Sequence, residues 1–498
     1  MPTLGLELCD AGLLTVVCDK NEIRPLAVPD RNGATDWPGF VYHEGSNYTF
    51  GRAAEDMWFV HPRRVAHTFW AKLAHDSSSS LIVVGRSPPF SELAFLFLRE
   101  FTGRLTAAHG SIEKIVLAVP GSYLGDPATE DEKIGLLLGL AHELKLPLAG
   151  IVDLACAALC DPRAPGFNPA LPIIVVDVQL EGTDLTLLAA DEQLERKQFL
   201  HLAGSGYAQL FKHLTATMGN RFLRHTAFDI LEDGRVEQMF FSQTRDFLLG
   251  HAAEHRYQIN TATRNYEMPA KYDQLAGDAQ AFVATVVHGL QTFVDQAAHA
   301  PGLCTIALTS RTAALPGIEA KLRAAGFLRQ LRLPAAAAAA GAARIGETRL
   351  GLMADLGDVP VAVAVPVSDT QRAAATKWEA RLQKTRHATP RPAPTHAIFD
   401  GLGHVIGSGP HFTIGPATLR ADVALPENFS SADDCIVPLV REGGRLWFVD
   451  PTPTDTPVPG GAAPRVVVEA GDRLTIRCGP AAAEVLFVHV PAMNGSHA

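Results

Sequence analysis

The sequence predicts an internally duplicated, two-lobed α/β body followed by a small all-β sandwich. A unit of strand, acidic turn and strand occurs near the N-terminus and again about 170 positions later. Each copy is followed by an apolar strand and a helix, whereas the C-terminal part contains short alternating runs separated by turns. Two similar halves that face one another would form a cleft, and the alternating runs are typical of a sandwich.

Both copies of the repeated unit are predicted to be β-hairpins, because apolar strands flank a turn that carries an acid. The strands and turns are expected at 4–8, 9–12 and 13–17 in the first copy and at 173–178, 179–183 and 185–188 in the second. The following strand and helix units are expected at 115–120 with a helix from Pro127, and at 305–308 with a helix from Pro316.

Three further segments complete the predicted organisation. Within a body of residues 1–366, the segment from about 210 to 300 is mostly helical in pattern and is expected to be an insertion. Residues 367–395 are rich in proline and basic residues, which favours a solvated linker over a docking site. Residues 396–492 are expected to form the sandwich.

Composition limits the function classes. At 498 residues the chain is longer than the ~250–300 residues that one core supports, so several domains are expected. With 43 Lys and Arg against 53 Asp and Glu, nucleic-acid binding is disfavoured. No apolar run approaches the ~20 residues of a membrane span, and the first residues lack the pattern of a signal peptide. A cytoplasmic protein without a membrane span is therefore expected, and the seven cysteines lack zinc spacing.

The first 350 or so residues carry a series of short motifs in a consistent order. They are 5–11 (GLELCDA), 50–54 (FGRAA), 119–123 (VPGSY), 151–159 (IVDLACAAL) and 308–317 (LTSRTAALPG). In this order they resemble the nucleotide-binding domain of the DnaK-type heat-shock chaperones. The resemblance implies the α/β actin-like ATPase fold, with an ATP and magnesium site between the two lobes.

The resemblance also implies which residues would serve that site. Matching positions in the nucleotide-binding turns are held by Glu7, Asp10, Gly182, Gly204, Gly206, Ser310 and Arg311. The positions that serve phosphate, the attacking water and magnesium are held by Lys72, Asp153 and Asp177, which form the alternative catalytic set.

Most of the glycines that let backbone N–H groups approach the phosphates are replaced in this chain. Ser310 and Arg311 stand where two glycines admit the adenosine, and Asp10 and Glu181 add two carboxylates. Each carboxylate ~4 Å from a phosphate costs about 1–4 kcal/mol. We therefore expect no cofactor, with weak binding of ATP and magnesium as the alternative.

The C-terminal region resembles a forkhead-associated (FHA) domain in segments 412–416 (FTIGP), 422–426 (DVALP) and 431–437 (SADDCIV). The resemblance implies a sandwich that binds a protein partner. Pro416 stands where the family has its phosphate-binding arginine, and Asp434 replaces a histidine. Only Ser431 remains as a hydroxyl donor, so we expect a protein-contact module that no longer selects phosphopeptides.

The sequence thus predicts a DnaK-like pseudo-ATPase that acts as a scaffold or assembly/adaptor subunit through protein–protein contacts. The alternative is an ATP-dependent, chaperone-like switch that binds and slowly hydrolyses Mg-ATP, and a filament-forming actin relative is a third hypothesis. No Walker A loop, Ser-His-Asp grouping or zinc signature suggests another activity.

Overall fold

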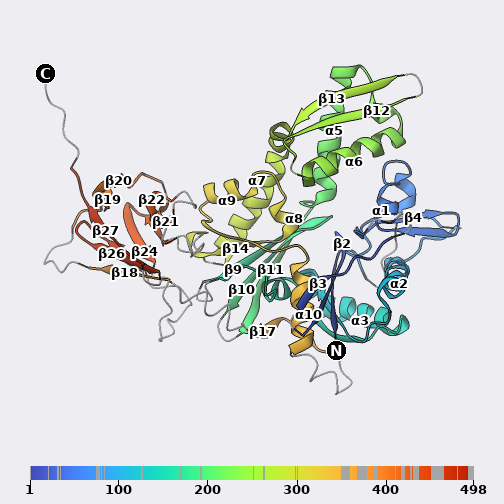
Figure 1. Ribbon diagram of the computed structural model, residues 1–498, viewed down its shortest axis with the longest axis horizontal. Helices are drawn as coiled ribbons and strands as arrows, with labels where there is room; N and C mark the ends of the chain where they lie inside the picture. The colour runs from blue at the N-terminus through green and yellow to red at the C-terminus, as the bar shows by residue number, and fades with distance from the viewer. Residues whose placement is uncertain are drawn as a thin grey trace.

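The structure is a computed structural model in which a mixed α/β body and a C-terminal module of β-strands lie beside one another (Figure 1). The mixed α/β class is as the sequence predicts. The structure describes residues 2–20, 22–30, 33, 35–74, 79, 81–83, 85–124, 127–167, 171–190, 193–250, 252–261, 264–297, 299, 301–348, 359–366, 378–384, 391–409, 411–416, 421–426, 429, 437–449, 465–478 and 481–491.

Two six-stranded sheets form the body, and five strands of each follow the same order, whereas the sixth strand lies at the opposite edge in the second sheet. In each, an antiparallel hairpin at one side continues into parallel strands at the other. The first half is built on β16 (Val361–Ala362), β8 (Leu148–Asp153), β7 (Ile115–Val119), β1 (Thr3–Cys9), β2 (Gly12–Asp19) and β3 (Glu22–Pro25). The second half is built on β15 (Arg329–Arg332), β14 (Thr305–Leu308), β9 (Ile173–Val178), β10 (Gly182–Ala190), β11 (Gln193–Ala203) and β17 (Ala364–Pro366).

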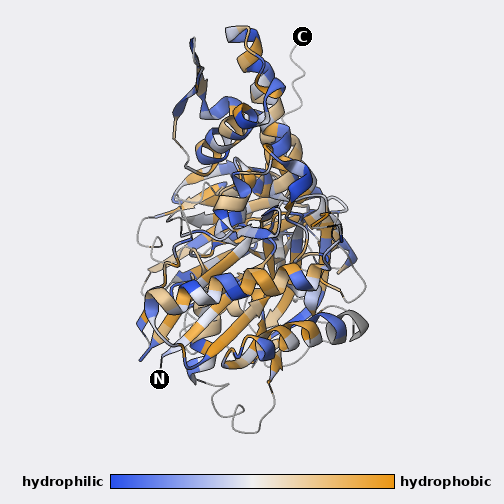
Figure 2. Ribbon diagram, turned by 90° about the vertical axis from the view of Figure 1, so that its right-hand side faces the viewer, coloured by the Kyte–Doolittle hydropathy of each residue, from blue (hydrophilic) through white to orange (hydrophobic). Residues whose placement is uncertain are grey.

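Helices cover the first sheet. In Figure 2, helices that carry both hydrophilic and hydrophobic residues lie in front of a largely hydrophobic sheet. Phe97 and Phe101 of α2 and Leu137 of α3 are buried in one core with β1 and β7, which explains their helical spacing. The remaining elements here are α2 (Phe90–His109), α3 (Pro127–Glu143), α1 (Arg52–Glu55), β4 (Val41–Glu44), β5 (Asn47–Phe50) and β6 (Val65–Ala66).

Two helices, α4 (Leu154–Leu159) and α10 (Ala337–Thr348), share a core with strands of both sheets. α10 is rich in alanine because it approaches its neighbours so closely. A Cβ at Gly5 of β1 would overlap the carbonyl oxygen of Ala339, and a Cβ at Gly341 would overlap that of Ala157. The alanine run therefore serves tight packing between the two halves.

The insertion follows β11 and is only partly as expected. Its helices are α5 (Tyr207–Thr226), α6 (Gly234–Gly250) and α7 (Tyr272–Gln296), and α7 buries the predicted apolar stripe. A hairpin of β12 (Glu254–Asn260) and β13 (Asn265–Lys271) lies between α6 and α7, which the helical prediction missed. In β12, buried Tyr257 and Ile259 alternate with exposed residues, and this period of two was the available signal.

The C-terminal module consists of two five-stranded sheets around a shared core. The order in the first sheet is β18 (Trp378–Gln383), β26 (Arg473–Cys478), β27 (Ala481–Val488), β19 (His396–Phe399) and β20 (Leu402–Val405). The order in the second sheet is β22 (Val423–Leu425), β21 (His411–Pro416), β23 (Val437–Glu442), β24 (Arg445–Val449) and β25 (Arg465–Val468). Every neighbouring pair is antiparallel except β21 and β22.

The predicted linker over 367–395 is wrong for its middle part. β18 pairs with β26 as an edge strand, and Lys384 contacts Asp472 at 2.7 Å. In β18 the buried Ala380 alternates with the exposed Arg381, a strand pattern that the basic composition obscured. Residues 367–377 and 385–390 lie outside the described residues.

Within the described ranges, no helix has both the length and the apolar character that crossing a membrane requires.

Helices α8 (Ser310–Ala313) and α9 (Ile318–Ala324) follow β14, and they complete the second half. Arg311 of α8 contacts Glu7 of β1 and Asp177 of β9, so α8 positions one of the residues considered next.

Candidate functional site

The turns of the two β-hairpins meet through Asp10. This residue lies between β1 and β2 and is 3% exposed. Its Oδ1 accepts the backbone N–H of Leu180 at 2.8 Å, and its Oδ2 accepts that of Glu181 at 2.9 Å. The carboxylate of Asp10 is therefore buried against the second turn.

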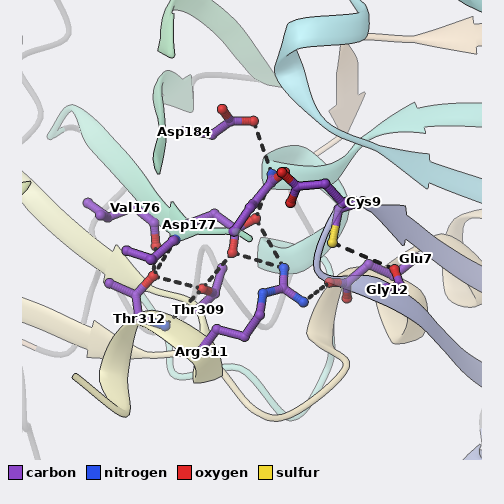
Figure 3. A network of polar contacts seen from close by, with 12 residues as sticks. Glu7, Cys9, Gly12, Val176, Asp177, Asp184, Thr309, Arg311 and Thr312 are labelled. Atoms are coloured by element: carbon purple, nitrogen blue, oxygen red, sulfur yellow. Dashed lines mark hydrogen bonds and ion pairs between the residues drawn. The ribbon is translucent and has the colours of Figure 1, made fainter. Parts of the chain in front are cut away.

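Arg311 links acids from both halves (Figure 3). Its Nη1 donates to Oε1 of Glu7 at 2.6 Å, and its Nη2 donates to the two carboxylate oxygens of Asp177 at 2.9 and 3.1 Å. Thr309, the N-cap of α8, donates its hydroxyl to Asp177 at 2.8 Å. The guanidinium thus occupies the space between two carboxylates that are themselves buried.

A second group of polar contacts extends from Asp177 along the sheet. Gln179 Nε2 donates to Asp177 at 3.0 Å and to Asp184 at 3.1 Å. His201 Nδ1 lies 2.7 Å from the carboxylate of Asp184, and this hydrogen bond raises the pKa of His201. Gln179 therefore holds two acids in place.

Asp153 is engaged by both helix α4 and the second half. It is the N-cap of α4, and its Oδ1 accepts the N–H groups of Ala155 at 2.9 Å and Cys156 at 3.1 Å. Its Oδ2 lies 3.1 Å from Nη1 of Arg196 in β11. Complete burial raises the pKa of Asp153. Both oxygens are thus used in structural contacts.

The other predicted site residues are distributed around this cleft. Gly182 opens β10 beside the ring of His201, and Ser310 opens α8. Gly204 has a φ of +72°, with open space at its Cβ position, and a Cβ at Gly206 would overlap the second turn. Lys72 is exposed, and Ser431 lies outside the described residues.

The described residues form one small pocket beside Arg311. A pocket of about 10 Å³ is lined by Glu7, Ser310 and Arg311 together with the start of α10. That volume is close to the space that one water molecule requires, whereas sites for drug-sized ligands have volumes of about 300–1,000 Å³.

The outer part of the cleft is bridged by aromatic side chains. Trp58 of the first half packs against Phe241 of α6 with ring centroids 5.4 Å apart, and against Phe40 at 5.1 Å. Arg245 of α6 lies 2.5 Å from Glu55. One hydrophobic core therefore runs from the first half into the insertion.

Sequence reasoning missed several of these residues. Arg311 was among the predicted site residues, but its ion pairs were not foreseen, because its two acidic partners are 134 and 304 positions away in the sequence. His67 lies 2.6 Å from Glu181. No local sequence pattern marked His67, Arg196 or Trp58. Their partners are distant in sequence, so only the fold brings them together.

Stability is expected to depend on pH through Asp10. Burial raises the pKa of Asp10 from 3.8 to about 7, against the lowering effect of its two backbone hydrogen bonds. The folded state therefore binds this proton more tightly than the unfolded state does. The free energy of unfolding should fall as the pH rises towards about 7, by about 1.4 kcal/mol per pH unit from this group.

Urea unfolding between pH 5 and 8 measures this dependence. Asp10→Asn should flatten the slope, because the amide does not titrate, whereas Asp233→Asn at an exposed carboxylate should keep it. Equal slopes in the native chain and Asp10→Asn would contradict the prediction. Burial raises the pKa of Glu7, Asp153 and Asp184 as well, so part of the slope should remain.

Within the described part of the chain, no three His, Cys, Asp or Glu side chains are grouped so that they could hold a metal ion. The buried acids are instead held by arginine, glutamine and backbone donors.

No protein-family model matches the chain, and no curated protein matches it either.

Proposed function

We propose that the chain is a pseudo-ATPase with the actin-like ATPase fold of the DnaK family, and that it acts as a scaffold or assembly/adaptor subunit. The body would supply a fixed two-lobed frame, and the C-terminal module, an FHA-like sandwich, would contact a protein partner. The order that five strands share in each of the two sheets supports the fold assignment.

The observation that carries the proposal is the ion pair of Arg311 with Glu7 and Asp177 in the cleft. Asp177 is the residue that the family resemblance assigns to magnesium. A guanidinium that already contacts both of its oxygens competes directly with a cation at that carboxylate. A bound metal would have to displace Arg311 and leave its charge buried.

The arrangement also does not fit a bound triphosphate. The N–H groups of Leu180 and Glu181 are taken by Asp10. A phosphate at these donors would meet the carboxylate of Asp10 and the side chain of Glu181, so charge repulsion would add to the loss of two hydrogen bonds. Asp153, assigned to the attacking water, is already bound to α4 and Arg196.

One observation favours the alternative switch. Gly204 retains the left-handed backbone of a tight turn, and open space surrounds the position of a Cβ there. Together with the exposed Lys72, this turn would be the part of a phosphate site that survives. In that case Mg-ATP would bind weakly at the rim of the cleft.

Calorimetric titration of the full chain with ATP, in the presence and absence of magnesium, tests the proposal. We expect no heat beyond dilution at submillimolar nucleotide. A thermal-shift assay provides a second measurement, because a ligand at one hundred times its Kd would stabilise the chain by about 2.7 kcal/mol. Submillimolar binding that requires magnesium would overturn the pseudo-ATPase and support the switch.

A further inference from the structure

We infer that Asp10 acts as a built-in ligand, whose carboxylate closes the cleft by binding the second hairpin turn and thereby fixes the start of the helical insertion. This inference rests on the proposed function, because the contact lies where the proposed pseudo-ATPase would otherwise bind a nucleotide. Asp10 belongs to the first half, whereas Leu180 and Glu181 belong to the second.

The contact has the geometry of a bound anion. Two carboxylate oxygens accept from two consecutive N–H groups, at 2.8 and 2.9 Å, in a buried setting. Consecutive backbone N–H groups of a turn commonly bind anions in this way. Here the anion is a side chain of the same molecule, so its local concentration is high and no external ligand is needed to join the turns.

The other side of the same turn is attached to α5. The carbonyl oxygen of Gln179 accepts the N–H of Tyr207, and that of Leu180 accepts the N–H of Ala208, both at 2.8 Å. Gly206 permits this approach, since a Cβ there would overlap the turn. Asp10 and the start of α5 therefore bind the same turn, so the contact of Asp10 helps to position the first helix of the insertion.

Further contacts between the halves act in the same direction. His67 of the first half lies 2.6 Å from Glu181, next to the turn that Asp10 binds. Arg196 of the second half contacts Asp153 and the carbonyl oxygens of Gly121 and Leu124. Asp10 differs from these in binding the backbone of the turn itself, so its removal should release that turn selectively.

Hydrogen–deuterium exchange of the full chain with Asp10→Ala tests the inference. At pH 8, where Asp10 with its pKa of about 7 is ionised, the amides of Leu180 and Glu181 should exchange about 10- to 100-fold faster, because a charge-assisted hydrogen bond is lost at each. The amides of Tyr207 and Ala208 should exchange faster by a smaller factor. Amides of β14 should stay protected, which separates release of the turn from unfolding.

Asp229→Ala is the matched control. Asp229 also accepts a backbone N–H, that of Leu231 at 2.9 Å, but this contact is local to the insertion. Its loss should change exchange at 230–232 and leave 180–181 unaltered. If Asp10→Ala does not fold, Asp10→Asn serves instead. Asparagine has a single acceptor oxygen, so it should keep one of the two backbone hydrogen bonds, and only one of the two amides should exchange faster.

Unchanged exchange at 180–181 in Asp10→Ala, or in Asp10→Asn where only that variant folds, would overturn the inference. Faster exchange at these amides with α5 unaffected would overturn the link to the insertion. Binding of Mg-ATP by the native chain would overturn the proposed function without altering either exchange result. The two failures are therefore distinguishable.

Discussion

Arg311→Met is expected to lower the free energy of unfolding by about 3–5 kcal/mol, because it leaves two buried carboxylates without their cation. Methionine keeps most of the side-chain volume, so the loss reports charge and not a cavity. The measurement is urea unfolding of the full chain at neutral pH, followed by the tryptophans of the body.

Arg332→Met is the control for this substitution. Arg332 also pairs with a glutamate, Glu319, but its side chain is 68% exposed, and such pairs contribute about 0–1 kcal/mol. A second substitution, Glu7→Gln, should recover part of the stability of Arg311→Met by removing one of the unpaired charges. Similar losses in Arg311→Met and Arg332→Met would contradict the proposed role of the cleft ion pair.

Trp58→Ala is expected to destabilise the chain by about 3–5 kcal/mol, because it leaves a large cavity where the first half meets the insertion. Trp58 is 5% exposed and contacts Phe40 and Phe241, and the ammonium group of Lys212 lies 5.0 Å from its ring. The loss should appear as a lower midpoint in urea and as faster amide exchange in α6.

Leu231→Ala is the comparison for Trp58→Ala. Leu231 belongs to the same insertion but is 48% exposed, so its truncation should change stability by no more than about 0.5 kcal/mol. A loss below about 1 kcal/mol for Trp58→Ala would mean that the packing of Trp58 against Phe40 and Phe241 contributes little to the stability of the chain.

Periodicity was a good guide wherever local pattern dominates. The hairpins at the two turns and helix α7 occur where alternation and helical spacing place them. Composition was a poorer guide, since the basic and proline-rich segment contains strand β18, and the helical insertion contains a hairpin. In both cases a short period-two pattern was hidden within a region of different average character.

The candidate site divides in the same way. The charged side chains of Asp10 and Arg311 are visible in the sequence, and both were among the predicted site residues. The sequence does not reveal that Arg311 joins Glu7 to Asp177, or that Asp10 binds the backbone at 180–181. Backbone donors have no sequence signature, so a contact to them is not predictable from residue types.

By itself, the sequence determined the mixed α/β class of the body and the two hairpins, because these follow from local period. Only the tertiary structure decided which partners Asp10 and Arg311 bind. It brings residues separated by 170 to 304 positions within hydrogen-bonding distance. A charged side chain can bind a ligand or another part of the same chain, and the structure shows that Asp10 and Arg311 bind backbone and side-chain groups of the chain itself.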